Sequence, residues 1–573
     1  MTVKLFDGLI LKTNGAIERS WSKTNMYAYK GLIGEAGGEG YASISKAGSI
    51  YWQNENYLTY DQSWNEHKLN LMLGASWSGS STESLSGSGQ GFTSNFFTWN
   101  NLGIAEKPGI PASGFSEWKM NSYYFRGNYN YSNKYLATLS MRYDGSSVFG
   151  ASNRFAFFPS LAVAWVLKEE RFLKDIDWLS NLKIRGSIGQ TGNAGISPYS
   201  TLATLNSTNV VFSDKTLQNG VILGNMPNSS LKWETTTQYD LGVELGLLNN
   251  RINLSADFYK KKTTDLLLYK PVSWVSGYSG VMDNVGEIEN HGIELTLNTH
   301  NIKSKDLNWF STLIYSANRN KVLKLSGDES DLWIGGFVGI NYLLVREGEP
   351  LYSVYGLKRA DSGTWGTDEA DEAAKYGKKP GDKKYVDKNN DGKIDYDNDG
   401  EILGNAYPKF EMSFSNTVTY KNFDLSLDIH AKYGNKAVNL TRMTDEQRLW
   451  YANTTKNSLN YWSPENQNTM IERPRTCMPG GGSAQEIQID SDLIEDASYI
   501  RFKNIMLGYT LPMESVSKLK IKGLRFYMNV ENFLVLTKYS GYDPEVSNMV
   551  GQGVEFYGHP KPMNINFGVN INF

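Results

Sequence analysis

The sequence predicts an all-β protein, the wall of a transmembrane antiparallel β-barrel with about sixteen strands. Three observations lead to this fold class. Apolar and polar residues alternate in about sixteen stretches, the connections between the stretches alternate long and short, and the chain ends on one such stretch. Alternation with a period of two places the apolar side chains on one face of a strand. A barrel wall needs that face toward lipid and a polar face inside.

The most regular single strand is the C-terminal stretch 562–573. Its apolar residues are Met563, Ile565, Phe567, Val569, Ile571 and Phe573, and every residue between them is Asn or Gly. About ten residues of a tilted strand cross a bilayer, which matches this length. A strand of a soluble β-sandwich shows the same alternation, because its inner face is also dry. The rest of the chain decides between the two.

Similar stretches recur along the whole chain. The clearest pair is a hairpin that turns at Asn249–Asn250. We expect the apolar side chains of this hairpin to face lipid, and its acidic side chains, such as Glu244, to face the interior. The lipid-facing residues are Leu241, Val243, Leu245, Leu254 and Phe258. The stretches before the last are, in order, 3–13, 51–61, 67–77, 121–131, 134–144, 158–167, 181–190, 239–247, 252–258, 293–297, 307–318, 410–418, 423–431, 498–511 and 520–533.

The connections favour a membrane barrel over a sandwich. Short links alternate with long ones to the end of the chain, and membrane barrels have short periplasmic turns and long extracellular loops. Sandwiches and propellers give no reason for such alternation. The long connections are 14–50, 78–120, 145–157, 191–238, 260–286, 319–407, 434–497 and 534–561.

Composition excludes several classes of protein. Hydrophobic residues make up 40% of the chain and the mean hydropathy is −0.44. No run of about eighteen apolar residues occurs, which excludes membrane-spanning helices but not barrel strands. The net charge of −3 gives no bulk attraction to nucleic acid, so we expect no nucleic-acid partner. Cys477 is the only cysteine, so no disulfide framework is expected.

Residues 387–399 have the spacing of an EF-hand calcium loop. Oxygen-bearing side chains stand at positions 1, 3, 5 and 9, and Gly392 stands at position 6, where such a loop turns sharply. Position 7 would offer only its backbone carbonyl, and position 12 is Asn398, so Asp399 would serve after a one-residue bulge. The predicted Ca²⁺ ligands are Asp387, Asn389, Asp391, Lys393, Asp395 and Asp399. The alternative interpretation is a solvated acidic turn without a metal.

Six groups of motifs follow one another between residues 142 and 545. They are 142–150 (RYDGSSVFG) with 158–160 (FPS) and Trp165; 182–185 (LKIR) with 189–193 (GQTGN); 284–286 (NVG) with 290–295 (NHGIEL); 404–405 (GN) with 408–410 (PKF); 499–504 (YIRFKN); and Asn532 with 539–545 (YSGYDPE). In this order they resemble the SusC/RagA branch of TonB-dependent outer-membrane transporters.

The resemblance implies a plugged barrel of about 22 strands, in which residues 1–573 are the C-terminal part and 319–407 a long extracellular loop with the calcium-like motif. The sequence shows no plug domain, TonB-interacting box or signal peptide, so we expect a barrel fragment. The implied function is nutrient import across the cell outer membrane, for oligosaccharides or peptides. The implied partners are outer-membrane lipids, a SusD-like surface lipoprotein, and TonB through the missing N-terminal part.

By the same resemblance the chain is expected to have no enzymatic activity. The alternative from another class is a secreted calcium-binding β protein, such as a carbohydrate-binding module or a glycosidase. Solubility separates the two, because a wall with one lipid-facing side should not stay monomeric without detergent.

Overall fold

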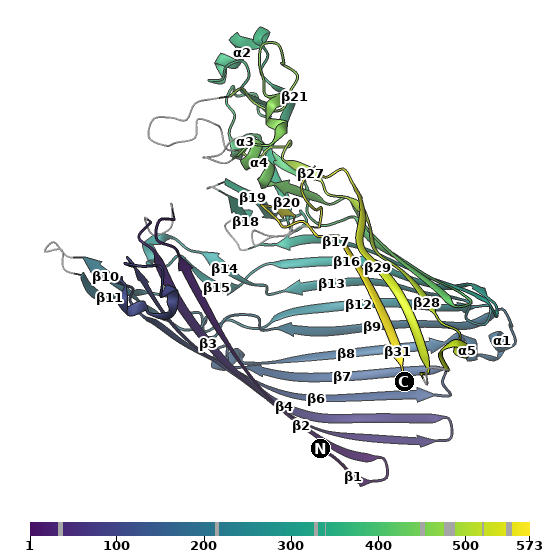
Figure 1. Ribbon diagram of the computed structural model, residues 1–573. Helices are drawn as coiled ribbons and strands as arrows, with labels where there is room; N and C mark the ends of the chain where they lie inside the picture. Colours follow the sequence, from purple (N-terminus) through teal and green to yellow (C-terminus); the bar gives the residue numbers. More distant parts are fainter. Residues whose placement is uncertain are drawn as a thin grey trace. The chain divides into compact units, whose positions relative to one another are not determined.

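The computed structural model describes residues 1–32, 38–211, 217–325, 331–337, 340–446, 453–474, 488–517, 521–545 and 553–573 (Figure 1). Cys477 lies outside these residues. Within them, no helix has both the length and the apolar character needed to cross a membrane.

Most strands belong to one large antiparallel sheet of 18 strands. Strands consecutive in the chain are paired side by side, for example β2 with β3, β3 with β4 and β24 with β25. The strands of the sheet are β1 (Thr2–Phe6), β2 (Leu9–Ala28), β3 (Tyr41–Trp64), β4 (His67–Gln90), β5 (Lys107–Pro108), β6 (Ala112–Tyr131), β7 (Tyr135–Ser146), β8 (Phe155–Val166), β9 (Leu179–Asn193), β12 (Glu234–Leu247), β13 (Ile252–Thr264), β16 (Glu287–Lys303), β17 (Leu307–Lys324), β24 (Phe410–Tyr420), β25 (Phe423–Tyr433), β28 (Tyr499–Thr510), β29 (Gly523–Thr537) and β31 (Asn564–Asn572).

The first part of the chain differs from the prediction in two ways. The predicted strand 3–13 is a hairpin, in which β1 pairs with the start of β2 across a turn at Gly8 with φ +86°. The predicted loops 14–50 and 78–120 are largely strand, since β3 and β4 are each 24 residues long. The polar, Ser- and Gly-rich half of β4 carries no apolar alternation. It still pairs with β3 and β6, because a strand ladder needs only backbone hydrogen bonds.

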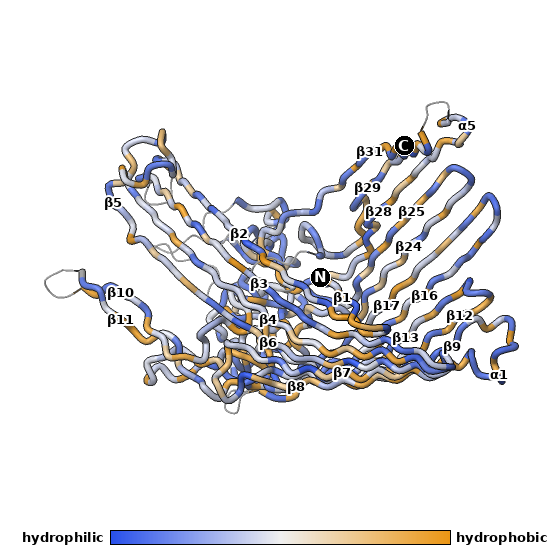
Figure 2. The backbone as a smooth tube through the Cα atoms, turned by 90° about the horizontal axis from the view of Figure 1, so that it is seen from below, coloured by the Kyte–Doolittle hydropathy of each residue, from blue (hydrophilic) through white to orange (hydrophobic). Residues whose placement is uncertain are grey.

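The predicted apolar face is exposed, as a lipid-facing surface requires. On β31, Phe567 is 77% and Val569 52% exposed. Of the predicted lipid-facing residues on β12 and β13, Leu241 and Phe258 are exposed, and Val243, Leu245 and Leu254 are half-buried. The hydropathy-coloured tube in Figure 2 shows the short-period alternation along these strands. Exposed apolar surface on this scale has no place in a water-soluble monomer.

The predicted short turns are present. Between β12 and β13, Leu248, Asn249 and Asn250 all have positive φ, from 54° to 58°. Between β24 and β25, Tyr420 pairs with Phe423, and Lys421 has φ +52°. Asn adopts this left-handed region more readily than most residues, which is why the Asn pair marks the turn in the sequence.

The chain divides into two compact units. Unit 1 comprises Met1–Trp165, Arg185–Tyr239 and Thr263–Val285. Beside its wall strands it contains two small hairpins, β10 (Leu205–Val211) with β11 (Leu217–Leu223) and β14 (Leu267–Pro271) with β15 (Gly280–Asn284). Its apolar cluster gathers Val148, Phe149, Phe158, Leu231 and Trp233. The Trp233 ring lies 5.3 Å from that of Phe149 and 5.5 Å from that of Phe158.

Unit 2 comprises Val166–Ile184, Asp240–Lys262 and Gly286–Phe573. Its long connections are folded. Between β17 and β24 lie a four-stranded sheet, a two-stranded sheet and two helices, and β26, β27 and β30 form a third small sheet. These elements are β18 (Asp331–Phe337), β19 (Ile340–Arg346), β20 (Ser353–Leu357), β21 (Arg359–Thr364), α2 (Ala370–Lys375), β22 (Lys383–Tyr385), α3 (Tyr396–Asp399), β23 (Gly400–Asn405), β26 (Lys436–Asn439), α4 (Leu440–Glu446), β27 (Ile494–Asp496) and β30 (Val554–Glu555). The remaining helices are α1 (Arg171–Lys174) and α5 (Met513–Val516).

The folded connections of unit 2 share an apolar core. Its buried members are Tyr342, Leu343, Val354, Val438, Leu440, Met443, Ile489, Leu493, Ile494 and Val554. They come from four separate stretches of the chain, so the segments between the wall strands pack on one another. This packing fixes the polar groups described below.

Candidate functional site

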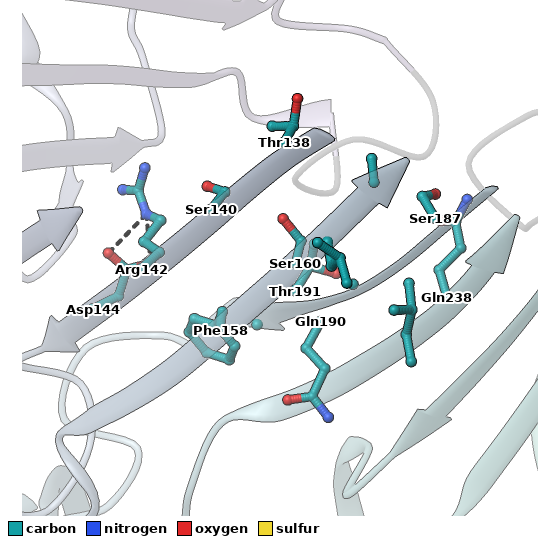
Figure 3. A pocket seen from close by; sticks show the side chains of 15 residues that line it. Thr138, Ser140, Arg142, Asp144, Phe158, Ser160, Ser187, Gln190, Thr191 and Gln238 are labelled. Atoms are coloured by element: carbon teal, nitrogen blue, oxygen red, sulfur yellow. Dashed lines mark hydrogen bonds and ion pairs between the residues drawn. The ribbon is translucent and has the colours of Figure 1, made fainter. Parts of the chain in front are cut away.

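A pocket of about 560 Å³ with polar and apolar lining residues lies among the wall strands of unit 1. It is formed by β7, β8, β9 and the start of β12. Figure 3 shows Thr138, Ser140 and Arg142 projecting from one side of β7, with Ser160 on the neighbouring strand. The other lining residues are Asp144, Phe158, Leu161, Ala162, Ser187, Ile188, Gly189, Gln190, Thr191, Gly192 and Gln238.

An ion pair fixes one end of this pocket. Nε of Arg142 lies 2.8 and 2.7 Å from the two carboxylate oxygens of Asp144, and its Nη2 donates to Ser122 Oγ at 3.0 Å. The guanidinium also lies over the Tyr124 ring, 5.7 Å from its centroid. Asp144 is buried, so the arginine is held in a defined orientation. The pocket thus offers hydroxyls, two amides and an oriented ion pair, which suit hydrogen bonding to a polar ligand.

The first motif of the sequence forms the junction between this pocket and the apolar cluster. Its Arg142 and Asp144 are the ion pair, and its Val148 and Phe149 are buried against Trp233. The sequence singled out the motif but not the pocket. The polar residues opposite the apolar face could have indicated a pocket. Strand pairing determines which of these residues lie together.

The two late motifs are joined by a buried ion-pair network. Arg501, on β28, donates to Asp543 at 2.6 Å, and its Nε lies 3.4 Å from Glu545. Glu545 also accepts from the Tyr499 hydroxyl and pairs with Lys561. Burial alone would raise the pKa of Glu545, but hydrogen bonds from His430, Lys561 and Tyr499 outweigh it and hold that pKa well below its usual range. The network links the connection that follows β29 to β28, the strand that precedes β29 in the chain.

The predicted calcium loop lies in unit 2, and α3 begins within it. Asp387 Oδ2 accepts from the Gly392 backbone N–H at 2.9 Å and from the Tyr376 hydroxyl at 3.1 Å. Asp391 Oδ1 accepts from the Lys393 N–H, also at 2.9 Å. Partial burial alone would raise the pKa of Asp387. The hydrogen bonds to its carboxylate outweigh the effect of burial, so the pKa is lower than that of a free aspartate.

The remaining predicted ligands are also engaged within the loop. Asp395 accepts from Asn398, which lowers its pKa. The two oxygens of Asp399 accept from the backbone N–H groups of Lys388 and Asp395, both at 2.8 Å. Asn389 donates to Asp391 at 2.9 Å.

The geometry of the loop matches a calcium site only in part. Gly392 has φ +82°, as the sharp turn requires, and Asp387 Oδ1 is buried without a hydrogen-bond partner. In the described part of the chain, however, no three Asp, Glu, His or Cys side chains are placed together so that they could hold a metal ion. The calcium site therefore stays a prediction.

Comparison with known proteins agrees with this architecture. Residues 13–533 match the family model for the TonB dependent receptor-like β-barrel. The chain is 35% identical over 583 residues to TonB-dependent receptor P3 of Formosa agariphila, covering 100% of this chain and 57% of that protein. It is 31% identical over 466 residues to TonB-dependent receptor SusC of Bacteroides thetaiotaomicron, covering 79% of this chain and 43% of that protein.

Among solved structures, the RagAB peptide transporter shares the fold. The TM-score is 0.84 at 24% identity, covering 100% of this chain and 61% of that one. The chain thus spans about half the length of the curated relatives it matches. The comparisons give no support to a secreted calcium-binding β protein, and they place the chain among outer-membrane proteins. From its strands, its exposed apolar face and these matches, the chain belongs to the TonB-dependent receptor β-barrel family.

Proposed function

We propose that this chain is the barrel portion of an outer-membrane importer for oligosaccharides or peptides, and that residues 319–407 form an extracellular loop of it. The observation that carries the proposal is a family-matching wall with an exposed apolar face and a pocket that hydroxyl, amide and charged side chains help to line. The related SusC and the structurally similar RagAB peptide transporter support the cargo classes. The chain acts by binding and passage, without covalent chemistry.

The same similarities support the partners. TonB supplies the energy through a part of the protein outside residues 1–573, a SusD-like lipoprotein delivers cargo at the surface, and outer-membrane lipids surround the wall. The named relatives are TonB-dependent receptors, which supports the first of these.

Uptake by a deletion strain tests the import proposal. A strain that lacks the gene should lose growth on limiting amounts of one cargo class, and a copy of the full-length gene should restore it. A Ser140→Trp copy should restore little growth, because Ser140 lines the pocket. The matched Leu139→Trp copy should restore growth fully, since Leu139 is exposed on the apolar face of the same strand. Unchanged growth of the deletion strain on every cargo would contradict import.

We also propose that the loop 387–399 binds Ca²⁺ for a structural purpose. The support is the ligand spacing, the left-handed Gly392 and the unpartnered Oδ1 of Asp387. A bound cation would draw Asp387, Asp391 and Asp395 together against their mutual repulsion. Calorimetry should detect binding at about 10⁻⁴–10⁻³ M, the range of extracellular sites. Equal heats for the parent and for Asp387→Ala or Asp391→Ala would reject the site.

A further inference from the structure

A second cavity, of about 430 Å³, lies within the folded connections of unit 2. Its walls are the end of β26, α4, the end of β30, the start of the 3-10 helix Lys456–Asn460 and the segment 540–542. The lining residues are Asn439, Thr441, Arg442, Asp445, Glu446, Thr455, Asn457, Ser540, Gly541, Tyr542 and Glu555. The motif in residues 539–545 therefore contributes to a cavity as well as to the ion-pair network.

The described lining residues of this cavity carry an excess of negative charge. Among the described lining residues the one cation is Arg442, and it is held by acidic partners. Its Nε donates to Glu446 and its Nη2 to Asp492, both at 2.7 Å, and its Nη1 lies 3.4 Å from Glu495. Burial alone would lower the pKa of Arg442, but the three carboxylates outweigh it and raise that pKa. The charge of this arginine is therefore already balanced by its own acidic partners.

Two further carboxylates line the cavity without a basic partner among the described residues. Asp445 accepts a hydrogen bond from the Tyr557 hydroxyl at 2.7 Å. Glu555 is only 1% exposed. One of its oxygens, Oε1, accepts from the Gly558 N–H at 3.0 Å, and the other, Oε2, is buried with no hydrogen-bond partner. Burying a carboxylate oxygen without a partner is costly, so a missing cationic partner is the natural explanation.

The chemistry of the lining selects an organic cation over a metal ion. No three acidic or His/Cys side chains in the described residues are placed to ligate a metal. The cavity instead provides carboxylates, the amide of Asn457 and the hydroxyl of Thr455 as separate acceptors. Tyr542, which is 61% exposed, adds an aromatic face at the cavity, suited to a cation–π contact. A volume of 430 Å³ admits the end of a lysine or arginine side chain.

We propose that this cavity binds the ammonium or guanidinium group of a peptide cargo, with Glu555 and Asp445 as the specificity-determining carboxylates. The inference rests on the proposed import function and narrows its cargo to peptides that carry lysine or arginine. Charge-assisted hydrogen bonds to a desolvated carboxylate are the strong class of such contacts.

Calorimetry on the purified chain in detergent tests the proposal. The probes are three tripeptides with acetylated and amidated ends, with a central Lys, Gln or Glu. The lysine peptide should bind, and the other two should bind at least tenfold more weakly. Glu555→Gln keeps the shape of the side chain and the acceptor for Gly558 but removes the charge. It should therefore lower the affinity for the lysine peptide at least tenfold. Asp445→Asn should lower this affinity too. Glu465 is an exposed carboxylate outside the lining, so the matched control Glu465→Gln should leave the affinity unchanged.

A thermal scan separates binding from folding. Glu555→Gln should unfold at the same or a higher temperature than the parent, because it removes a buried charge without a partner. Equal affinity for the lysine and glutamine peptides, or unchanged affinity in both Glu555→Gln and Asp445→Asn, would overturn the proposal. The proposal would also be overturned if CaCl₂ gave a binding heat that Glu555→Gln abolishes, while the lysine peptide gave no binding heat. Import itself is judged separately, by the growth of the deletion strain and the Ser140→Trp copy.

Discussion

The two faces of β12 allow a quantitative test of the membrane orientation. Val243 lies at the middle of the segment 239–247, on the same face as the exposed Tyr239 and Leu241, and Glu244 lies on the opposite face. Arginine on the lipid face near the bilayer midplane costs about 2–4 kcal/mol. We therefore expect Val243→Arg to lower the free energy of unfolding by that amount.

The neighbouring substitution provides the matched control. Glu244 pairs with Lys183 at 3.1 Å, and both side chains are about one-third exposed. A pair this accessible to solvent contributes only about 0.2–1 kcal/mol. Glu244→Arg loses that contribution and adds repulsion from Lys183, so it should cost about 1 kcal/mol. The two variants should therefore differ by about 1–3 kcal/mol, with Val243→Arg the less stable.

Denaturant unfolding in lipid vesicles, followed by strand content and tryptophan fluorescence, measures both free energies. Spin labels at the same two positions give an independent readout, since the label at 243 should be relaxed by oxygen from the lipid and the label at 244 by a water-soluble reagent. Equal costs for the two arginines, a larger cost for Glu244→Arg, or water accessibility at both labels would refute the assignment of faces.

Two further predictions concern the packing and the ion-pair network. Trp233→Ala should destabilise unit 1 by about 3–5 kcal/mol, because Trp233 is buried between two rings. Trp274 is exposed, so Trp274→Ala should change the free energy of unfolding by no more than about 0.5 kcal/mol in the same denaturation series. Similar costs for the two substitutions would contradict the packing. The pKa of Glu545 is depressed in the folded chain, so its contribution is present above the unfolded value of about 4.3 and is lost as pH falls further. Thermal unfolding of the parent and of Glu545→Gln should accordingly differ at pH 6 and converge toward pH 3, and a constant difference would argue against the network.

Side-chain alternation alone predicts most of the wall strands, their two faces and the fold class, because alternation is a local property of an extended backbone. The apolar faces of β12 and β31 and the turn at Asn249–Asn250 could be predicted this way. The polar halves of β3 and β4 could not, since backbone pairing there leaves no apolar pattern.

Which polar groups meet depends on contacts between segments that are far apart in the sequence. Arg501 and Asp543 are 42 residues apart in the chain, and Arg442 and Asp492 are 50 apart. The pocket behind Arg142 draws on four strands, and the cavity at Glu555 draws on elements from 439 to 555. Likewise, the spacing of residues 387–399 predicted ligands, but the loop's own hydrogen bonds decided where their oxygens point. Spacing along the chain defines which groups are available, whereas burial and long-range packing determine which of them share a site.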